Sequence, residues 1–135
     1  METAEARRRV AAARVGHLAT VTPEGRPHLV PCCFALVDDA LVSAVDGKPK
    51  STTALRRLAN VEAHPAVTLL VDHYDDGDWS ALWWVRVDGR ARVVRDGPER
   101  ERGLDALGAK HRQYREVRPP GALIVVEDLT WRSWP

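Results

Sequence analysis

The sequence predicts a mainly β fold with a few helices, and three observations favour this class. Short runs rich in apolar and β-branched residues recur along the chain, separated by turn-forming segments such as Pro23-Glu24-Gly25-Arg26 and Asp38-Asp39. Hydrophobic residues make up 44% of the 135 residues, enough for a sizeable core. The six runs with strand character are mostly linked as hairpins, which indicates a closed or partly closed antiparallel barrel.

The N-terminal third predicts one helix followed by a meander of three strands. Residues 2–14 are rich in Ala, Arg and Glu, which are good helix formers, and we expect this helix to end near Gly16. Strands are predicted over residues 17–22, 27–37 and 40–45. The turns between them are short, so the three strands should pair antiparallel in chain order.

The rest of the chain predicts two helices and three further strands. A helix over residues 51–62 takes Ser51 or Thr52 as its N-cap and ends at His64-Pro65. The other elements are strands over 66–71, 81–94 and 121–131 and a helix over 98–115. The acidic run over 72–78 lacks the closing Glu of a calcium loop, so it predicts a solvated hairpin tip.

Charge and composition narrow the function classes. The formal net charge is +1, which gives no general attraction to nucleic acid or membranes. The chain has no apolar run of about 20 residues that would span a bilayer, and its N-terminus lacks the apolar segment of a secretion signal. Cys32 and Cys33 are adjacent and rarely bridge each other, so they predict reduced thiols in a cytoplasmic protein.

The segment from Lys48 to Arg57 is the main candidate for binding a ligand. It holds Lys48, Lys50, Arg56 and Arg57, with no acidic residue between Gly47 and Val61. The segment joins a strand to a helix, and a helix N-terminus presents free N–H groups and partial positive charge. Lysine, arginine and hydroxyl side chains at such a position favour a phosphate. The alternative is a solvated, basic start of a helix.

Other residue types suggest no conventional catalytic machinery. The five histidines form no close metal-binding pair, so no metal site is predicted. Cys32 and Cys33 have no base beside them, which favours a structural role. Trp79, Trp83 and Trp84 fit core and dimer packing, or contact with a planar ligand. A compact β domain with a phosphate-binding segment and many aromatics is typical of an enzyme whose chemistry belongs to a cofactor.

Three blocks of sequence resemble the pyridoxamine 5'-phosphate oxidase-like split β-barrel superfamily. The first comprises Gly16-His17-Leu18-Ala19-Thr20-Val21, Pro23-Glu24-Gly25-Arg26-Pro27-His28 and Val30-Pro31. The second comprises Lys48-Pro49-Lys50, Leu55-Arg56-Arg57-Leu58-Ala59-Asn60 and His64-Pro65-Ala66-Val67. The third, residues 79–91, is similar to an actinobacterial branch of probable coenzyme F420-dependent enzymes in the flavin/deazaflavin oxidoreductase group. The resemblance covers roughly residues 5–132.

The resemblance implies a single domain over residues 1–135, folded as a six-stranded antiparallel split β-barrel of the FMN-binding type. It further implies a homodimer with two cofactor sites at the interface. Carried over by position, Lys48, Lys50 and Arg56 would bind the cofactor phosphate or an acidic tail, with Arg57 in reserve and Ser51 and Thr52 adding contacts. Thr20, Val21, Pro31 and Cys32 would lie along the ring. Trp79, Trp83 or Arg86 would come from the partner subunit, and Asn60 would cap or brace the helix end.

The resemblance implies an F420-dependent oxidoreductase that transfers a hydride between the deazaflavin and an unsaturated small-molecule acceptor. Two alternatives stay open: an FMN-binding oxidoreductase of the same superfamily, and a non-catalytic flavin- or haem-binding protein. A purely structural homodimer is a further alternative, suggested by the tryptophan content. No residue of the sequence stands out as a proton donor.

Overall fold

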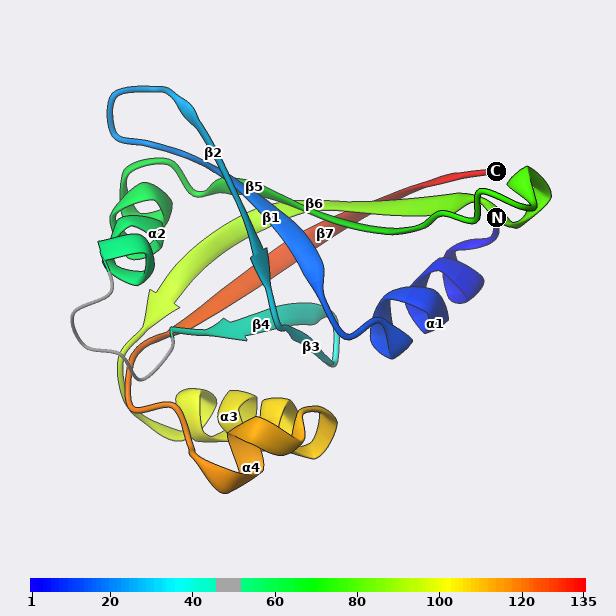
Figure 1. Cartoon of the computed structure of the whole chain (residues 1–135). Helices are drawn as coiled ribbons and strands as arrows, with labels where there is room; N and C mark the ends of the chain where they lie inside the picture. The colour runs from blue at the N-terminus through cyan, green and yellow to red at the C-terminus, as the bar shows by residue number, and fades with distance from the viewer. Residues whose placement is uncertain (46–51) are drawn as a thin grey trace.

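The computed structural model of the chain describes residues 1–45 and 52–135, and of residues 52–54 only the backbone (Figure 1). Its elements in chain order are α1 (Thr3–Ala12), β1 (Gly16–Val21), β2 (Pro27–Cys32), β3 (Ala35–Val37), β4 (Ala40–Ala44), α2 (Thr52–Ala63), β5 (Ala66–His73), the 3-10 helix η1 (Trp79–Ala81), β6 (Trp83–Val94), α3 (Pro98–Lys110), α4 (Arg112–Glu116) and β7 (Leu123–Trp134). The predicted mainly β fold class, with a few helices, is confirmed.

The strands of the described residues form one antiparallel sheet in the order β2-β1-β5-β6-β7-β4-β3. Two hairpin turns depend on residues with positive φ, namely Gly25 between β1 and β2 and Asp38 between β3 and β4. Glycine and aspartate tolerate this conformation, so the turn segments predicted from the sequence lie where they are needed.

The prediction of six strands was wrong, because the stretch over residues 27–37 is two strands. The chain leaves β2 after Cys32, and Phe34 turns into the core, where it is 1% exposed. After this break β2 pairs with β1, whereas β3 pairs with β4 at the other edge of the sheet. The sheet therefore curls without closing, and its two edges are joined covalently through Cys33 and Phe34.

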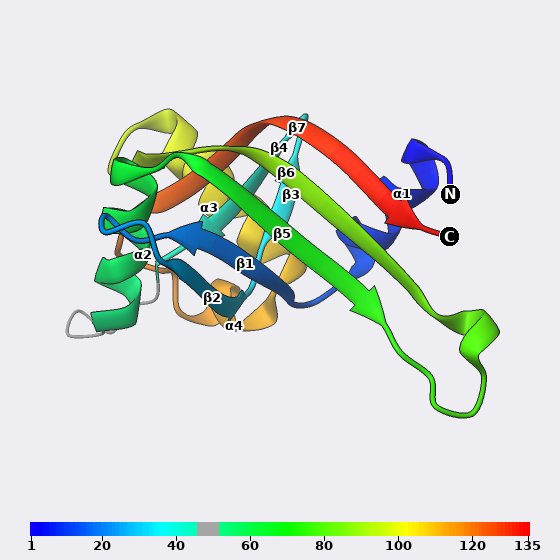
Figure 2. The ribbon, with the colours of Figure 1, turned by 90° about the horizontal axis from the view of Figure 1, so that it is seen from above.

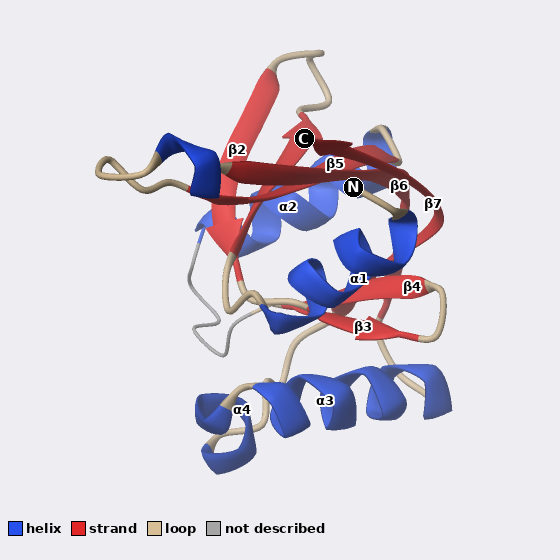
Figure 3. Cartoon of the chain, turned by 90° about the vertical axis from the view of Figure 1, so that its right-hand side faces the viewer, coloured by secondary structure: helices blue, strands red, loops and turns tan. Residues whose placement is uncertain are grey.

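Helices α1 and α2 pack against the inner face of the sheet, whereas α3, which α4 follows, packs against the other face at β4 and β7. Val10 of α1 and Val61 of α2 pack into one cluster with Phe34 and the buried residues of β1, β5 and β6. Leu104 and Leu107 of α3 pack against β4 and β7 in a second cluster. Figure 3 shows α3 and α4 below β3 and β4. The predicted helix over 98–115 is two helices, because the backbone at His111 is extended.

Away from α3, the face of the sheet opposite α1 and α2 is left open. Strand alternation sends Leu69, Val71 and Val85 inward, so their neighbours Leu70 and Trp84 point outward. We call this exposed side of β2, β1, β5, β6 and β7 the outer face. It carries a hollow of about 600 Å³ with mainly aromatic and apolar walls, lined by Leu70, Asp72, His73, Tyr74, Leu82, Trp83, Trp84, Arg86 and Trp134.

Within the described residues, none of the helices has the length and apolar character that crossing a lipid bilayer requires.

Candidate functional site

Arg57 is a buried cation without a counter-ion among the described residues. It lies on α2, which packs against β1 and β6, and its side chain is only 8% exposed. Its Nε is buried and has no hydrogen-bond partner in the described part of the chain. A buried guanidinium left unpaired is costly, so this position favours an anion supplied by a ligand.

The thiol of Cys32 lies close enough to Arg57 for the charge of the guanidinium to affect its pKa. Burial raises the pKa of the Cys32 thiol, and a hydrogen bond with Ser43 and the charges of Arg57 and Lys110 oppose this shift. The thiol is thus neutral at physiological pH, which fits the structural role expected for it. Arg57 and Lys110 come from two different helices, and both act on the last residue of β2.

Asn60 braces α2 against β1, one of the two roles that the sequence suggested for it. Its side chain is 0% exposed, and its Nδ2 donates to Thr20 Oγ1 at 3.0 Å. Its Oδ1 has no partner among the described residues. The contact fixes α2, and with it Arg57, relative to the first hairpin.

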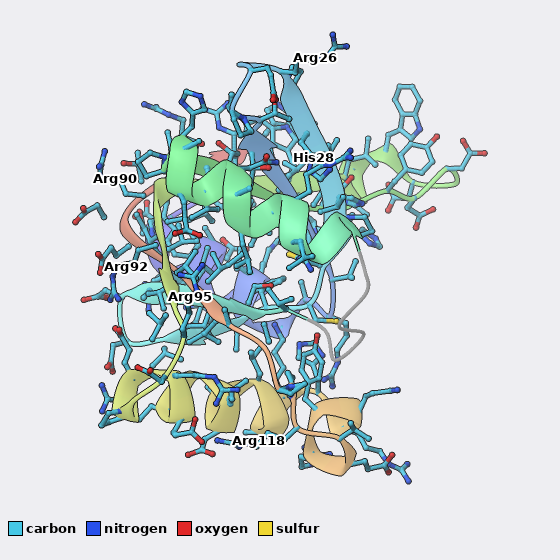
Figure 4. All side chains as sticks on the ribbon, turned by 90° about the vertical axis from the view of Figure 1, so that its left-hand side faces the viewer. Arg26, His28, Arg90, Arg92, Arg95 and Arg118 are labelled. Carbon is cyan, nitrogen blue, oxygen red and sulfur yellow. The ribbon has the colours of Figure 1, made fainter. Side chains whose placement is uncertain are left out.

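A groove of about 630 Å³ lies between the β1–β2 hairpin and α2. Arg26, His28 and Arg56 line it together with Glu24, and neither arginine forms an ion pair with a described carboxylate. Figure 4 shows Arg26 at the hairpin tip and His28 nearer to α2. The groove adds positive charge beside Arg57, on the hairpin side of the helix.

The four residues predicted to follow the cofactor ring do not share one face of the sheet. Thr20 and Cys32 are buried on the core side, whereas Val21 is half-buried and Pro31 is exposed on the outer face. In register, Thr20 lies opposite His28, and Cys32 opposite Gly16 at the other end of the hairpin. Of these residues, Cys32 lies within the field of Arg57.

The aromatic candidates lie at the far end of the long β5–β6 hairpin from α2 (Figure 2). Trp79 is 67% exposed in η1. Trp83 packs partly into the core, stacks on His73 with ring centres 6.3 Å apart, and lies under the Arg9 guanidinium. Arg86 points to the outer hollow and forms an ion pair with Asp88 at 3.4 Å. Within one chain, these side chains therefore lie far from Arg57.

The structure does not describe the side chains of the remaining predicted site residues. Lys48, Lys50 and Ser51 lie outside the described residues, and Thr52 begins α2 with a side chain that is likewise not described.

Lys110, at the end of α3, is a residue that sequence reasoning missed. Its Nζ is buried, lies 3.9 Å from the centre of the Phe34 ring, and has no hydrogen-bond partner among the described residues. Burial, with the nearby charge of Arg14, lowers the pKa of Lys110 to about 8. No local pattern could have revealed it, because the contact arises from packing of α3 beside the end of β2.

Residues 1–45 and 52–135 contain no group of three His, Cys, Asp or Glu side chains arranged to hold a metal ion.

Solved structures share this fold at low sequence identity. A conserved hypothetical protein of Mycobacterium tuberculosis has a TM-score of 0.80 and 22% identity, over 99% of this chain and 84% of the other. An FAD-binding protein of Mesorhizobium loti has a TM-score of 0.71 and 24% identity, over 100% and 96%. The haem storage protein of Vibrio cholerae has a TM-score of 0.73 and 16% identity, over 98% and 92%.

A search of curated protein sequences gave no match. The sequence model of the family described as pyridoxamine 5'-phosphate oxidase matches residues 2–135, nearly the whole chain. Together with the open antiparallel sheet and its flanking helices, this match shows that the chain belongs to the pyridoxamine 5'-phosphate oxidase family.

Proposed function

We propose that the chain is an oxidoreductase that binds a flavin-type cofactor and anchors the cofactor phosphate at Arg57. The observation that carries this proposal is the buried, unpartnered Nε of Arg57. A phosphate would accept from the guanidinium and offset its buried charge. Membership of the family and a structural relative described as FAD-binding support a flavin-type ligand.

The basic segment before Arg57 belongs to the same phosphate site in this proposal. Lys48, Lys50, Ser51 and Thr52 lead into the N-terminus of α2, where free N–H groups and the helix dipole favour an anion. Arg56 points to the other side of the helix, into the groove with Arg26 and His28. It is therefore placed to meet a second acidic group of the cofactor.

Between the two cofactors we favour coenzyme F420, with FMN as the alternative. Arg26 and Arg56 line the groove and form no ion pair with a described carboxylate, which supports a ligand with an acidic extension beyond its first phosphate; F420 carries such an extension and FMN lacks it. When bound, the deazaflavin would supply hydride transfer to an unsaturated small-molecule acceptor. The chain's own contribution is to hold ring and acceptor in contact and to shield them from water.

The outer face is proposed as the interface of a homodimer. It exposes Leu29 and Trp134, and the half-buried Trp84 lines the apolar hollow together with Trp134, so a partner would remove these side chains from water. In such a dimer, Trp79, Trp83 and Arg86 of one chain would lie near Arg57 of the other chain, from which they are distant within a single chain.

Replacing Trp84 with glutamate is expected to convert the dimer to a monomer, because two charges would be buried against an apolar surface. Sedimentation velocity measures the change. Val117→Glu serves as the control, because it adds the same charge at an exposed apolar residue after α4 that does not line the hollow. A Trp84→Glu protein that sediments as a dimer would exclude the outer face as the interface.

A non-catalytic haem- or flavin-binding protein is the second candidate. A structural relative described as a haem storage protein favours it, as does the lack of an evident acid–base pair in the sequence. This candidate differs from the first because it requires binding without turnover.

Titration of the purified protein with F420, FMN and haemin separates the candidates. We expect saturable binding of F420 that is tighter than that of FMN, followed by oxidation of reduced F420 when acceptors are added. Binding of FMN alone would reverse the order of the two cofactors. A Soret band with haemin and no flavin-type binding would overturn the proposal in favour of haem binding.

A further inference from the structure

The groove between the β1–β2 hairpin and α2 holds two buried polar atoms that have no partner among the described residues. One is Oδ1 of Asn60, whose side chain is 0% exposed, and the other is Nδ1 of His28. Both residues line this groove of about 630 Å³, Asn60 from α2 and His28 from β2. A buried hydrogen-bonding atom without a partner is costly, so the groove favours a ligand that supplies both partners.

A buried contact keeps these two residues at the same level of the hairpin. Asn60 Nδ2 donates to Thr20 Oγ1 at 3.0 Å, so the Oδ1 end of the carboxamide is left for another donor. Thr20 pairs with His28 across β1 and β2, and residues directly opposite each other have Cβ atoms about 4.5–5.5 Å apart. Asn60 and His28 are therefore near enough to bind one small polar group between them.

The two atoms differ in what they require of that group. Asn60 Oδ1 only accepts hydrogen bonds, whereas His28 Nδ1 donates when it carries the ring proton. A secondary amide offers the matching pair, namely an N–H for Asn60 and a carbonyl oxygen for His28. An ionised phosphate has acceptor oxygens and no N–H, so it would leave Asn60 Oδ1 unpaired beside a negative charge. The inner end of the groove thus matches an amide better than a phosphate.

The rim of the groove carries charge that matches carboxylates. Arg26 at the hairpin tip and Arg56 on α2 form no ion pair with a described carboxylate, and together they outweigh the single glutamate of the lining, Glu24 (Figure 4). Arg57 precedes Asn60 by three residues on α2, which is about 4.5 Å along the helix axis. The groove therefore continues from the proposed phosphate site.

We propose that Asn60 and His28 select a cofactor whose extension is an amide-linked acidic tail over a cofactor whose extension is a nucleotide. Asn60 accepts from the amide N–H of the tail, His28 donates to its carbonyl oxygen, and Arg26 and Arg56 bind its carboxylates. The preference of the groove for an amide is a property of the groove alone, whereas the assignment of the tail to a cofactor rests on the proposed function.

Two small probes test the groove by itself in the full-length protein without cofactor. N-acetyl-γ-glutamylglutamate and tricarballylate each carry three carboxylates, but only the first contains amides. We expect N-acetyl-γ-glutamylglutamate to bind at least about fivefold more tightly, the effect of one or two hydrogen bonds, when ¹⁵N NMR signals of the Asn60 side chain and the His28 ring are followed. Equal affinities, or binding of neither probe, would overturn the preference for an amide.

Replacing His28 with phenylalanine keeps the ring and removes Nδ1. We expect this variant to lose most of the preference for the amide probe and to keep its tricarballylate affinity within about twofold. The control is His64→Phe, at an exposed histidine just after α2 that does not line the groove, and it should keep the preference. An undiminished preference in folded His28→Phe would exclude His28 from the amide contact, and the same result in folded Asn60→Leu would exclude Asn60.

Titration with whole cofactors separates this inference from the proposed function. The wild type should bind F420 at least about tenfold more tightly than the F420 derivative that lacks the glutamate tail, and it should bind FAD no more tightly than FMN. Tighter binding of FAD than of FMN would overturn the selection against a nucleotide and leave flavin binding intact. Binding of N-acetyl-γ-glutamylglutamate without binding of F420 or FMN would overturn the proposed function and leave the preference of the groove intact.

Discussion

Replacing Arg57 with methionine is expected to weaken FMN binding by about 10- to 100-fold, the effect of losing one or two charge-assisted hydrogen bonds to the phosphate. Methionine keeps most of the length of the side chain and removes the charge. Because no described residue pairs with the Arg57 Nε, its loss breaks no ion pair within residues 1–45 and 52–135, and the melting temperature should stay the same or rise. Fluorescence titration of FMN, with thermal unfolding of the same protein, measures both effects.

Two further variants make this experiment specific. Arg90→Met removes an exposed arginine of β6 that has no ion pair among the described residues, and it should leave FMN affinity within about twofold. Arg57→Lys keeps the charge but loses the planar fork, so its affinity should fall between those of the wild type and Arg57→Met. Wild-type affinity in a folded Arg57→Met protein would remove Arg57 from the phosphate site.

Replacing Phe34 with alanine is expected to lower the free energy of unfolding by about 3–5 kcal/mol, the usual cost of truncating a buried phenylalanine. The ring is 1% exposed, lies in the main core cluster beside Leu18 and Leu69, and supports the Lys110 ammonium. Denaturant unfolding followed by tryptophan fluorescence measures the loss.

The control for Phe34 is Val117→Ala, at an apolar side chain that is 67% exposed after α4 and lies outside the outer hollow. It should change stability by no more than about 0.5 kcal/mol. If Phe34→Ala costs as little as Val117→Ala, Phe34 does not anchor the junction between β2 and β3.

The hairpins of the fold could be predicted from the sequence because their determinants are local. Gly25 and Asp38 provide the positive φ that the two turns require, and alternating apolar residues set which face of each strand is buried. The break after Cys32 could not be predicted in this way. The run from Pro27 to Val37 has continuous strand character, and only tertiary packing of Phe34 and pairing at opposite sheet edges divide it.

The candidate site shows the same division between local and tertiary information. The basic residues before and within α2 were visible as a run without acidic residues, and this pattern pointed to Arg56 and Arg57. The sequence ranked Arg57 below Arg56, because burial depends on how α2 packs against the sheet. Lys110 had no local pattern at all, since it lies next to Cys32 only after α3 folds beside the end of β2.

The central claim is that this chain recognises its cofactor by the phosphate, at a buried arginine. The most direct test compares the affinities of the wild type and Arg57→Met for FMN and for riboflavin, which has the same ring without the phosphate. We predict that the wild type binds FMN at least about tenfold more tightly than riboflavin, and that Arg57→Met removes most of this difference. Equal affinity of the wild type for FMN and riboflavin would contradict the account.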